Sequence, residues 1–324
     1  MTKKHISKKW IFLIAGVVLA GIIAAILIVC TSDQKYYDIT DAESFSQWHK
    51  KIIYNGHSYH LNPNISPILF LGVDHADGLD DAIYMGRGGR SDTLYVFLLN
   101  KKEKTNTLLS ISRDTMTEVD VYNPEGEYYF SGEMQVTMQY AYGKDDKNSC
   151  KLAVKTISEL LYDLDFDAYI AVNLEAITKV IDMMGGLTIT MPEDYSYIDP
   201  RYTQGATLTL NSWEVEWLLR YRDATQLESN DDRMERQTTL IRTVVDELKN
   251  QNISSMLSDI LKIAKSDITT NAGLGTIKKI ASYDLTEERY TVPGETRAGA
   301  IHAEFYVDQK ALMDLLVELF YVRE

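Results

Sequence analysis

The longest uncharged stretch of the chain, residues 10–30, most constrains its organisation. It reads WIFLIAGVVLAGIIAAILIVC, which is 21 residues without an acidic or basic side chain. At 1.5 Å per residue, a helix of this length extends roughly 30 Å, about the thickness of the hydrocarbon core of a bilayer. Four lysines precede the stretch and no acidic residue does, which is the charge bias of a cytoplasmic N-terminus. The sequence therefore predicts a cytoplasmic tail at residues 1–9 and a transmembrane helix at residues 10–30.

A cleaved signal peptide is the main alternative for this segment. Signal peptides carry an apolar region of about 7–15 residues that ends in small side chains. This stretch is longer and ends in Ile28, Val29 and Cys30, and Val29 is too large for the small residue that precedes a lipidated cysteine. We therefore expect a retained single-pass anchor in the cell membrane, with the rest of the chain outside the cell.

The charge of the remaining chain excludes one large class of partners. The whole sequence has a net charge of −14, from 33 Lys and Arg residues and 47 Asp and Glu residues. Four of the lysines precede the apolar stretch, so the chain after residue 30 has 29 basic and 47 acidic residues. Nucleic-acid binding needs a basic surface, so we expect no nucleic-acid partner. The two cysteines are too few for a disulfide scaffold, and Cys150 is predicted to be a thiol without chemistry.

Apolar periodicity predicts alternating strands and helices. Residues 31–65 are polar and aromatic without a strong period, which predicts an extracellular spacer with one short helix near residues 42–51. Continuous apolar runs then predict strands buried on both faces. We expect strands near residues 68–73, 93–99, 107–111, 168–172, 187–191, 289–292 and 303–307, and helices near 149–161, 174–184, 211–219, 233–249, 254–264, 273–280 and 308–320. The predicted class is α/β, with a central mixed sheet flanked by helices on both faces.

Charged residues gather at the ends of the first three predicted strands. Asp74 follows the first strand, Arg90 and Asp92 precede the second, and Arg113 follows the third. Ligands of open α/β sheets bind at strand ends, although any one of these charges is also consistent with a solvated strand end. Asp74 and Asp92 share one edge only if the first two strands are antiparallel, so the prediction requires a mixed sheet.

A second group of arginines lies in the helical half of the chain. Arg220 and Arg222 lie roughly 200° apart on a continuous helix, so they face one site only if the helix ends near residue 219. On the next helix, the apolar stripe extends back to Gln237 and, within about 40°, to Arg233. A buried Arg–Asp pair would explain this pattern, and so would an anion site, because the planar guanidinium group binds phosphate. The nearby aspartates Asp74 and Asp92 are the candidate ligands for Mg²⁺, which takes one or two carboxylates and completes its shell with water and phosphate.

Several motifs in a fixed order resemble the LytR-CpsA-Psr family of membrane-anchored cell-wall ligases. They are ILFLGVD (68–74), GRSDTLYVFLLN (89–100), SISRDT (110–115), AYG (141–143), MMGGLTITMP (183–192), LLRYRD (218–223) and RMERQ (233–237). Together with ITTN (268–271) and YTVPGE (290–295), they extend the resemblance over residues 66–322, which we expect to be the catalytic domain.

The resemblance implies a Mg²⁺-dependent phosphotransferase of cell-wall assembly. Such an enzyme moves a glycopolymer, for example teichoic acid or capsule, from a polyprenyl-pyrophosphate carrier to peptidoglycan. It implies that Asp74, Asp92 and Arg113 are catalytic and that the two aspartates hold the metal. It also implies a set of residues that contact the pyrophosphate, namely Arg90, Arg113, Arg220, Arg222, Arg233, Arg236 and Gln237.

The chain departs from the family pattern at a few positions. His75 stands where an arginine is usual, and Gln135, Val136 and Thr137 replace the usual Lys-Ile-Asn. The loss of that cation and amide leaves a second function open, a non-catalytic scaffold or sensor of the same fold that binds polyprenyl-phosphate lipids.

Overall fold

The computed structural model describes residues 36–41, 44–45, 47–74, 89–123, 125–221, 229–250, 262–263, 266–300 and 302–324. The chain divides into two compact units, one made of residues 1–62 with 316–324 and the other of residues 63–315. Within the described ranges, no helix has the length and apolar character needed to cross a bilayer. The predicted transmembrane helix at residues 10–30 lies outside these ranges.

A six-stranded mixed sheet forms the centre of the larger unit. Its strand order is β12-β9-β4-β5-β6-β13. The β4–β5, β5–β6 and β9–β12 pairs are antiparallel, whereas β4–β9 and β6–β13 are parallel. The bounds are β4 (Ile65–Asp74), β5 (Arg90–Asn100), β6 (Thr105–Ile111), β9 (Ala168–Asn173), β12 (Ile268–Thr270) and β13 (Asp284–Thr291). The antiparallel β4–β5 pair confirms the mixed sheet that the sequence required.

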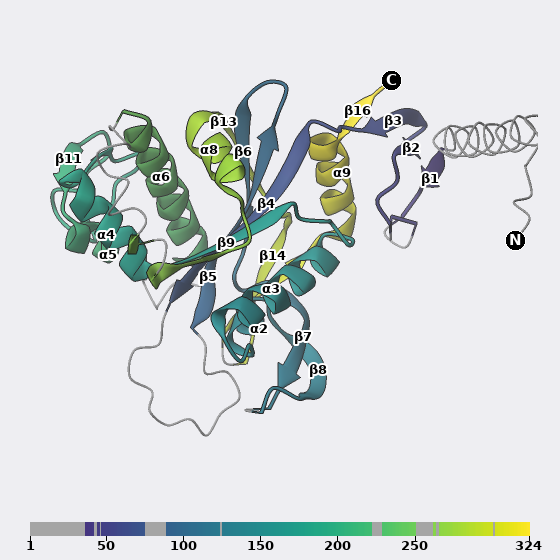
Figure 1. The fold of residues 1–324 in the computed structure, drawn as a ribbon, viewed down its shortest axis with the longest axis horizontal. Helices are drawn as coiled ribbons and strands as arrows, with labels where there is room; N and C mark the ends of the chain where they lie inside the picture. The colour runs from purple at the N-terminus through teal and green to yellow at the C-terminus, as the bar shows by residue number, and fades with distance from the viewer. Residues whose placement is uncertain are drawn as a thin grey trace, which may run out of the picture. The chain divides into compact units, whose positions relative to one another are not determined.

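Helices cover both faces of this sheet (Figure 1). On one face, Ile68, Tyr95 and Phe97 form a core with apolar residues of α6 (Ser229–Asn250) and α8 (Leu274–Ser282). On the other face, α2 (Met138–Ala141) and α3 (Asp146–Leu160) lie against β5 and β9. Cys150 on α3 is a buried free thiol, as predicted, and burial raises its pKa to about 12.

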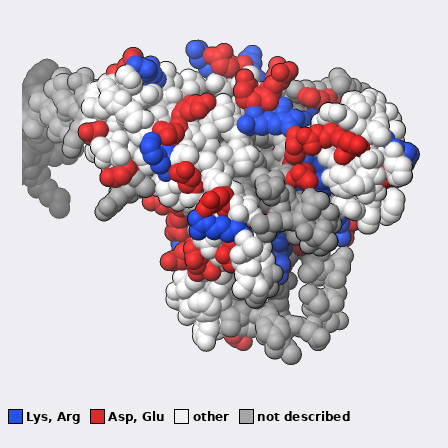
Figure 2. Space-filling view, turned by 180° about the vertical axis from the view of Figure 1, so that it is seen from behind, with Lys and Arg blue, Asp and Glu red and all other residues white. Residues whose placement is uncertain are grey.

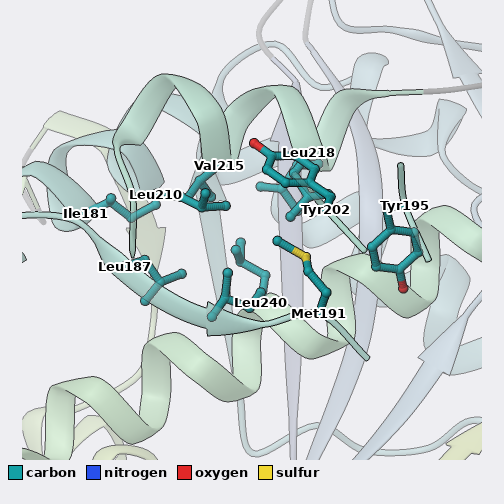
Figure 3. Packing of buried hydrophobic residues seen from close by; sticks show 11 residues of the cluster. Ile181, Leu187, Met191, Tyr195, Tyr202, Leu210, Val215, Leu218 and Leu240 are labelled. Atoms are coloured by element: carbon teal, nitrogen blue, oxygen red, sulfur yellow. The ribbon is translucent and has the colours of Figure 1, made fainter. Parts of the chain in front are cut away.

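A helical lobe beside the sheet has a core of its own (Figure 3). It consists of α4 (Leu174–Met184), β10 (Leu187–Thr190), β11 (Thr207–Leu210) and α5 (Ser212–Arg220), with Leu240 of α6 completing the core. Two helix ends in it are as predicted. Gly185 ends α4 in the left-handed conformation with φ 78°, and Asn211 with Glu214 forms a capping box at the start of α5.

Two antiparallel strand pairs that are not part of the central sheet also belong to the larger unit. The hairpin of β7 (Met116–Tyr122) and β8 (Tyr128–Gln135) follows β6, and β14 (Gly294–Ala298) pairs with β15 (Ala303–Val307) after β13. The last helix, α9 (Gln309–Phe320), begins in the larger unit, and its residues from 316 onward belong to the smaller one. Most of the predicted helix near residues 254–264 lies outside the described residues.

The smaller unit corrects one prediction. Instead of a spacer with a helix near residues 42–51, it contains a four-stranded sheet of β1 (Tyr37–Ile39), β2 (Lys51–Tyr54), β3 (His57–Leu61) and β16 (Tyr321–Arg323). None of the described residues in 42–51 is helical. Asn55 and Gly56 turn between β2 and β3 with φ of 49° and 74°, the conformation of a two-residue hairpin. This Asn-Gly pair was the sequence signal for the hairpin, and the spacer interpretation overlooked it.

Candidate active site

A cavity of about 310 Å³ opens at the ends of β4 and β5, between the sheet and helices α4, α5 and α6. Its charged and polar lining includes Asp74, Asp92, Arg113, Arg220, Arg233 and Gln237. These six residues are separated by up to 163 positions in the chain, and all of them were selected from the sequence. Most of the remaining lining is apolar and is contributed by Phe70, Val73, Val172, Leu174, Ile177, Leu219, Leu240 and Ile241.

A β-bulge directs Asp92 into this cavity. Gly72 pairs with Thr93 but the next residue, Val73, pairs with Ser91, so Asp92 is the extra residue of β5. In a regular strand, successive side chains alternate between faces, and Asp92 would then point away from the face that Thr93 occupies. A bulge re-aims side chains, and both Asp92 and Thr93 line the cavity.

Two buried guanidinium groups hold the carboxylate of Asp92. Arg113 forms an ion pair with Oδ2 through Nη1, and Nη1 of Arg233 lies 3.6 Å from the same oxygen. Arg233 also donates through Nη2 to the main-chain oxygen of Asp92 at 3.0 Å, and Thr137 donates to Oδ1 at 3.2 Å. The side chains of Arg113 and Arg233 are only 9% and 6% exposed. Their positive charge is therefore fixed in place at the floor of the site.

The carboxylate of Asp74 lies in much more open surroundings. It accepts a hydrogen bond of 3.0 Å from Nη2 of Arg220, and both side chains are about half exposed. Glu216 lies one turn back on α5, with an oxygen 3.3 Å from Nε of Arg220. Gly89 packs on the backbone of Asp74 so closely that a Cβ there would lie 1.9 Å from the main-chain oxygen. The position of Asp74 therefore depends on glycine at residue 89.

The wall of the cavity formed by α6 carries an amide as well as Arg233. Gln237 is buried, and its Oε1 has no hydrogen-bond partner among the described residues. Because a carboxamide can present either its oxygen or its NH₂ group, this side chain is available to a polar ligand. Tyr95 fixes the same helix from the sheet, bonding Oγ1 of Thr238 at 2.8 Å and donating to the main-chain oxygen of Met234 at 3.1 Å. Burial raises the pKa of Tyr95 to about 12, so it keeps its proton.

Two arginines predicted to contact pyrophosphate, Arg90 and Arg236, do not line the cavity in the described structure. Arg90 pairs with Asp74 in the strand register, but its side chain is exposed and outside the lining. Arg236 is buried and donates to the main-chain oxygens of Leu218 and Tyr221, so it holds the end of α5. Arg222 lies outside the described residues. As predicted, α5 ends near residue 219, at Arg220, and Arg220 lines the cavity.

The residues that replace Lys-Ile-Asn still touch the acidic groups of the site. Thr137 donates to Asp92, as described above, and Nε2 of Gln135 donates to Oδ1 of Asp114 at 2.7 Å. Asp114 in turn lies 3.5 Å from Nε of Arg113. Sequence reasoning interpreted these substitutions only as losses, because it had no way to place them beside the carboxylates.

The chemistry of the cavity lining is compatible with Mg²⁺. Two carboxylates, Asp74 and Asp92, line one cavity whose arginines suit phosphate. No group of three or more His, Cys, Asp or Glu residues suited to a metal occurs among the described residues. A shell made of protein side chains alone is therefore absent there, whereas Mg²⁺ commonly takes one or two carboxylates and draws its other ligands from water and substrate phosphate.

The face of the molecule shown in Figure 2 has no broad basic area that would attract polyanions. On the face shown in Figure 2, basic side chains occur in small groups beside acidic ones and form no continuous basic area among the residues drawn. The cavity, in contrast, has Arg113, Arg220 and Arg233 in its lining.

The sequence matches a known family over most of its length. A model described as the LytR_cpsA_psr family matches residues 28–317. Among individual relatives, the polyisoprenyl-teichoic acid–peptidoglycan teichoic acid transferase TagU of Bacillus licheniformis is 28% identical over 261 residues, 78% of this chain and 76% of the relative. Biofilm regulatory protein A of Streptococcus mutans is 23% identical over 245 residues, 70% of this chain and 58% of that protein.

Solved structures show the same fold. TagT bound to LI-WTA superposes with a TM-score of 0.58 and 25% identity, covering 79% of this chain and 90% of that one. TagU of B. subtilis gives a TM-score of 0.55 at 23% identity, covering 78% and 95%. The mixed sheet flanked by helices is thus the fold of these proteins as well.

Proposed function

Because the chain belongs to the LytR_cpsA_psr family, we propose that it transfers a glycopolymer from a polyprenyl-pyrophosphate carrier to peptidoglycan in cell-wall assembly. Relatives named as teichoic acid transferases support the reaction type. The observation that carries the proposal is that Arg113, Arg220, Arg233 and two carboxylates line one cavity whose other lining residues are mostly apolar. An amphipathic lipid pyrophosphate has this distribution of charge and apolar surface.

The charged and the apolar parts of the cavity lining would bind different parts of the carrier. Arg113 and Arg233 are buried and fixed, so they would bind the pyrophosphate oxygens through charge-assisted hydrogen bonds. Phe70, Ile177 and Leu240 belong to the apolar lining that would take the first isoprene units. Because the side chains of Arg113 and Arg233 are buried, their ionic contacts would be stronger than contacts at the surface.

In the proposed reaction, a hydroxyl oxygen of peptidoglycan attacks the phosphorus that carries the glycopolymer. A new P–O bond forms, the P–O bond to the second phosphate breaks, and polyprenyl phosphate leaves with the bonding electrons. Asp74 would accept the hydroxyl proton, because its half-exposed carboxylate is accessible to an acceptor from solvent. Arg113 and Arg233 would stabilise the charge that develops on the leaving phosphate.

We propose Asp74 and Asp92 as the residues that would hold Mg²⁺ together with substrate phosphate oxygens. Bound there, the ion would supply charge neutralisation for the transferring phosphoryl group. We also propose that residues 10–30 anchor the enzyme in the cell membrane with the catalytic domain outside, beside a lipid-linked substrate.

Transfer by the full chain in detergent micelles tests the proposal. The chain would be given a polyprenyl-pyrophosphate-linked glycan, peptidoglycan and Mg²⁺, and polymer attached to peptidoglycan would be measured. We expect transfer by the unchanged chain and none above background by Asp92→Ala, because that substitution removes the partner of two buried guanidinium groups.

The non-catalytic alternative predicts a different result in the same assay. A lipid-binding scaffold would bind the carrier without transferring polymer, and Asp92→Ala would change nothing that the assay detects. The contacts of Thr137 and Gln135 favour the enzyme, since the substituted segment still positions the acidic groups of the site.

A further inference from the structure

Aromatic side chains on α5 and beside its C-terminal end form a largely exposed strip that the proposed reaction does not use. We define the aromatic strip as Trp213, Trp217, Tyr221 and Tyr197. Trp213 and Trp217 are 67% and 45% exposed, and Tyr197 is 50% exposed. Monomeric proteins rarely expose clustered large aromatic side chains without a function. These tryptophans lie outside the lining of the cavity described above.

The rings of the aromatic strip are ordered relative to one another. The two indole rings are parallel within 7°, with centroids 6.2 Å apart, which is offset stacking. Tyr221 follows with its ring centroid 6.1 Å from Trp217, and Tyr197 lies 5.6 Å from Tyr221. Arg236 holds the far end, donating to the hydroxyl of Tyr197 at 3.1 Å and to the main-chain oxygen of Tyr221 at 2.6 Å. The strip is therefore organised before any partner binds.

The aromatic strip leads to the charged end of the cavity. Trp213 and Arg220 are seven residues apart on α5, so they lie on nearly the same side of the helix and about 10 Å apart along its axis. Arg220 pairs with Asp74 in the cavity, and Glu216 lies beside Arg220 on the same side. A ligand held by Arg220 would extend along this side of α5 over a distance close to the length of a disaccharide.

From these observations we infer that the aromatic strip binds the first sugar units attached to the pyrophosphate. This inference rests on the proposed function and adds to it a subsite for the glycan. The faces of hexopyranose rings carry polarised C–H groups that pack on the electron-rich faces of aromatic rings. Glu216, which is about one-third exposed, could accept hydrogen bonds from sugar hydroxyls at the same place.

Charge argues against a bilayer as the occupant of the strip. Residues 185–221 contain five acidic and two basic residues and no lysine. Anionic lipid surfaces attract segments rich in lysine and arginine, whereas this segment is acidic. An uncharged, hydroxyl-rich ligand fits better than a membrane surface.

The test compares two lipids that differ only in the sugar. The full chain in detergent micelles would be titrated calorimetrically with farnesyl pyrophosphate and with farnesyl pyrophosphate carrying N,N′-diacetylchitobiose. We expect the glycosylated lipid to bind more tightly. In the double variant Trp213→Ala/Trp217→Ala, its affinity should fall about 5- to 10-fold, the effect of losing one or two aromatic contacts, while farnesyl pyrophosphate changes by less than about twofold.

Two further variants make the outcome specific. Trp213→Phe/Trp217→Phe should keep most of the preference for the sugar, and Tyr129→Ala should keep all of it, since Tyr129 is an exposed aromatic residue on β8. An equal loss for both lipids would overturn the inference, because a contact with the bilayer or with a second copy does not depend on sugar. Equal affinities of the unchanged chain for both lipids would also overturn it. Failure to bind farnesyl pyrophosphate would instead contradict the proposed function.

Discussion

Asp92 and Asp74 line the same cavity, but Asp92 is mostly buried and Asp74 is half exposed. The carboxylate of Asp92 is 21% exposed and contacts two guanidinium groups that are less than one-tenth exposed. The carboxylate of Asp74 is 50% exposed and contacts one guanidinium group, that of Arg220, which is 52% exposed. One half of the site is therefore fixed by burial, and the other half can rearrange at little cost.

This difference assigns different tasks to the two halves. Side chains that are already desolvated and oriented lose little entropy when a charged ligand arrives, so the Asp92 half suits binding of the pyrophosphate. An exposed ion pair contributes little to stability and exchanges readily with solvent. The Asp74 half is thus suited to admitting the acceptor and exchanging a proton.

Arg113→Ala should give the largest effect of the substitutions that test this contrast. It removes one guanidinium group from the mostly buried carboxylate of Asp92, and we expect a loss of about 2–4 kcal/mol in the free energy of unfolding. The affinity for farnesyl pyrophosphate should weaken by roughly 1.5–3 kcal/mol, the size of a charge-assisted hydrogen bond. Urea unfolding and calorimetric titration of the full chain in detergent would measure both quantities.

Arg297→Ala is the matched control for that variant. Arg297 pairs with Glu295 on β14, and both side chains are about 60% exposed, so neither quantity should change by more than a few tenths of a kcal/mol. If Arg113→Ala left the affinity for farnesyl pyrophosphate unchanged, Arg113 would have no place in the binding site.

Gly72→Ala should have the next largest effect, and it acts on the same half of the site. A Cβ at Gly72 would lie 2.7 Å from Cβ of Thr93, directly across the strand pair and beside the bulge. β4 and β5 would have to separate there, and we expect a loss of about 1–3 kcal/mol in the free energy of unfolding, as for other overpacked sites.

Gly275→Ala provides the comparison for this glycine. A Cβ at Gly275 in α8 meets nothing within 4 Å, so alanine should be neutral or stabilise the helix by up to about 1 kcal/mol. Equal urea midpoints for the Gly72 and Gly275 variants would show that the bulge tolerates a wider strand spacing. Close packing of β4 and β5 at Gly72 would then not be needed to position Asp92.

The strands of the sheet and the helix ends were predictable because their signals are local. Continuous apolar runs marked β4, β5 and β6, and Asn211, Glu214 and Gly185 marked helix ends through their own backbone hydrogen bonds. The hairpin between β2 and β3 was also predictable, because Asn55 and Gly56 form a turn without help from the rest of the chain. The sequence analysis predicted a spacer there instead, because the short flanking strands have weak alternation.

The direction of individual side chains in the site was not predictable. Asp92 enters the cavity only because of the bulge opposite Gly72 and Val73, which depends on the register of two strands. Arg233 and Arg236 are three residues apart on α6, and the sequence favoured both as ligands of phosphate. The structure turns Arg236 toward the end of α5 instead, a choice that tertiary packing makes.

Arg220→Ala should have the smallest effect on stability and separates the two halves by their response to salt. Because Arg220 and Asp74 are half exposed, we expect a change of at most about 1 kcal/mol in the free energy of unfolding. The substitution should still weaken binding of farnesyl pyrophosphate. The difference in affinity between the variant and the unchanged chain should become smaller when salt rises from about 0.01 to 0.15 M, because the Debye length falls from about 30 to about 8 Å. The loss of affinity caused by Arg113→Ala should persist over the same range, because burial shields that contact from counterions.

Calorimetric titrations of both variants at the two salt concentrations would measure this response. An identical response of the two variants to salt would mean that the two halves of the site do not differ in the way their exposure indicates.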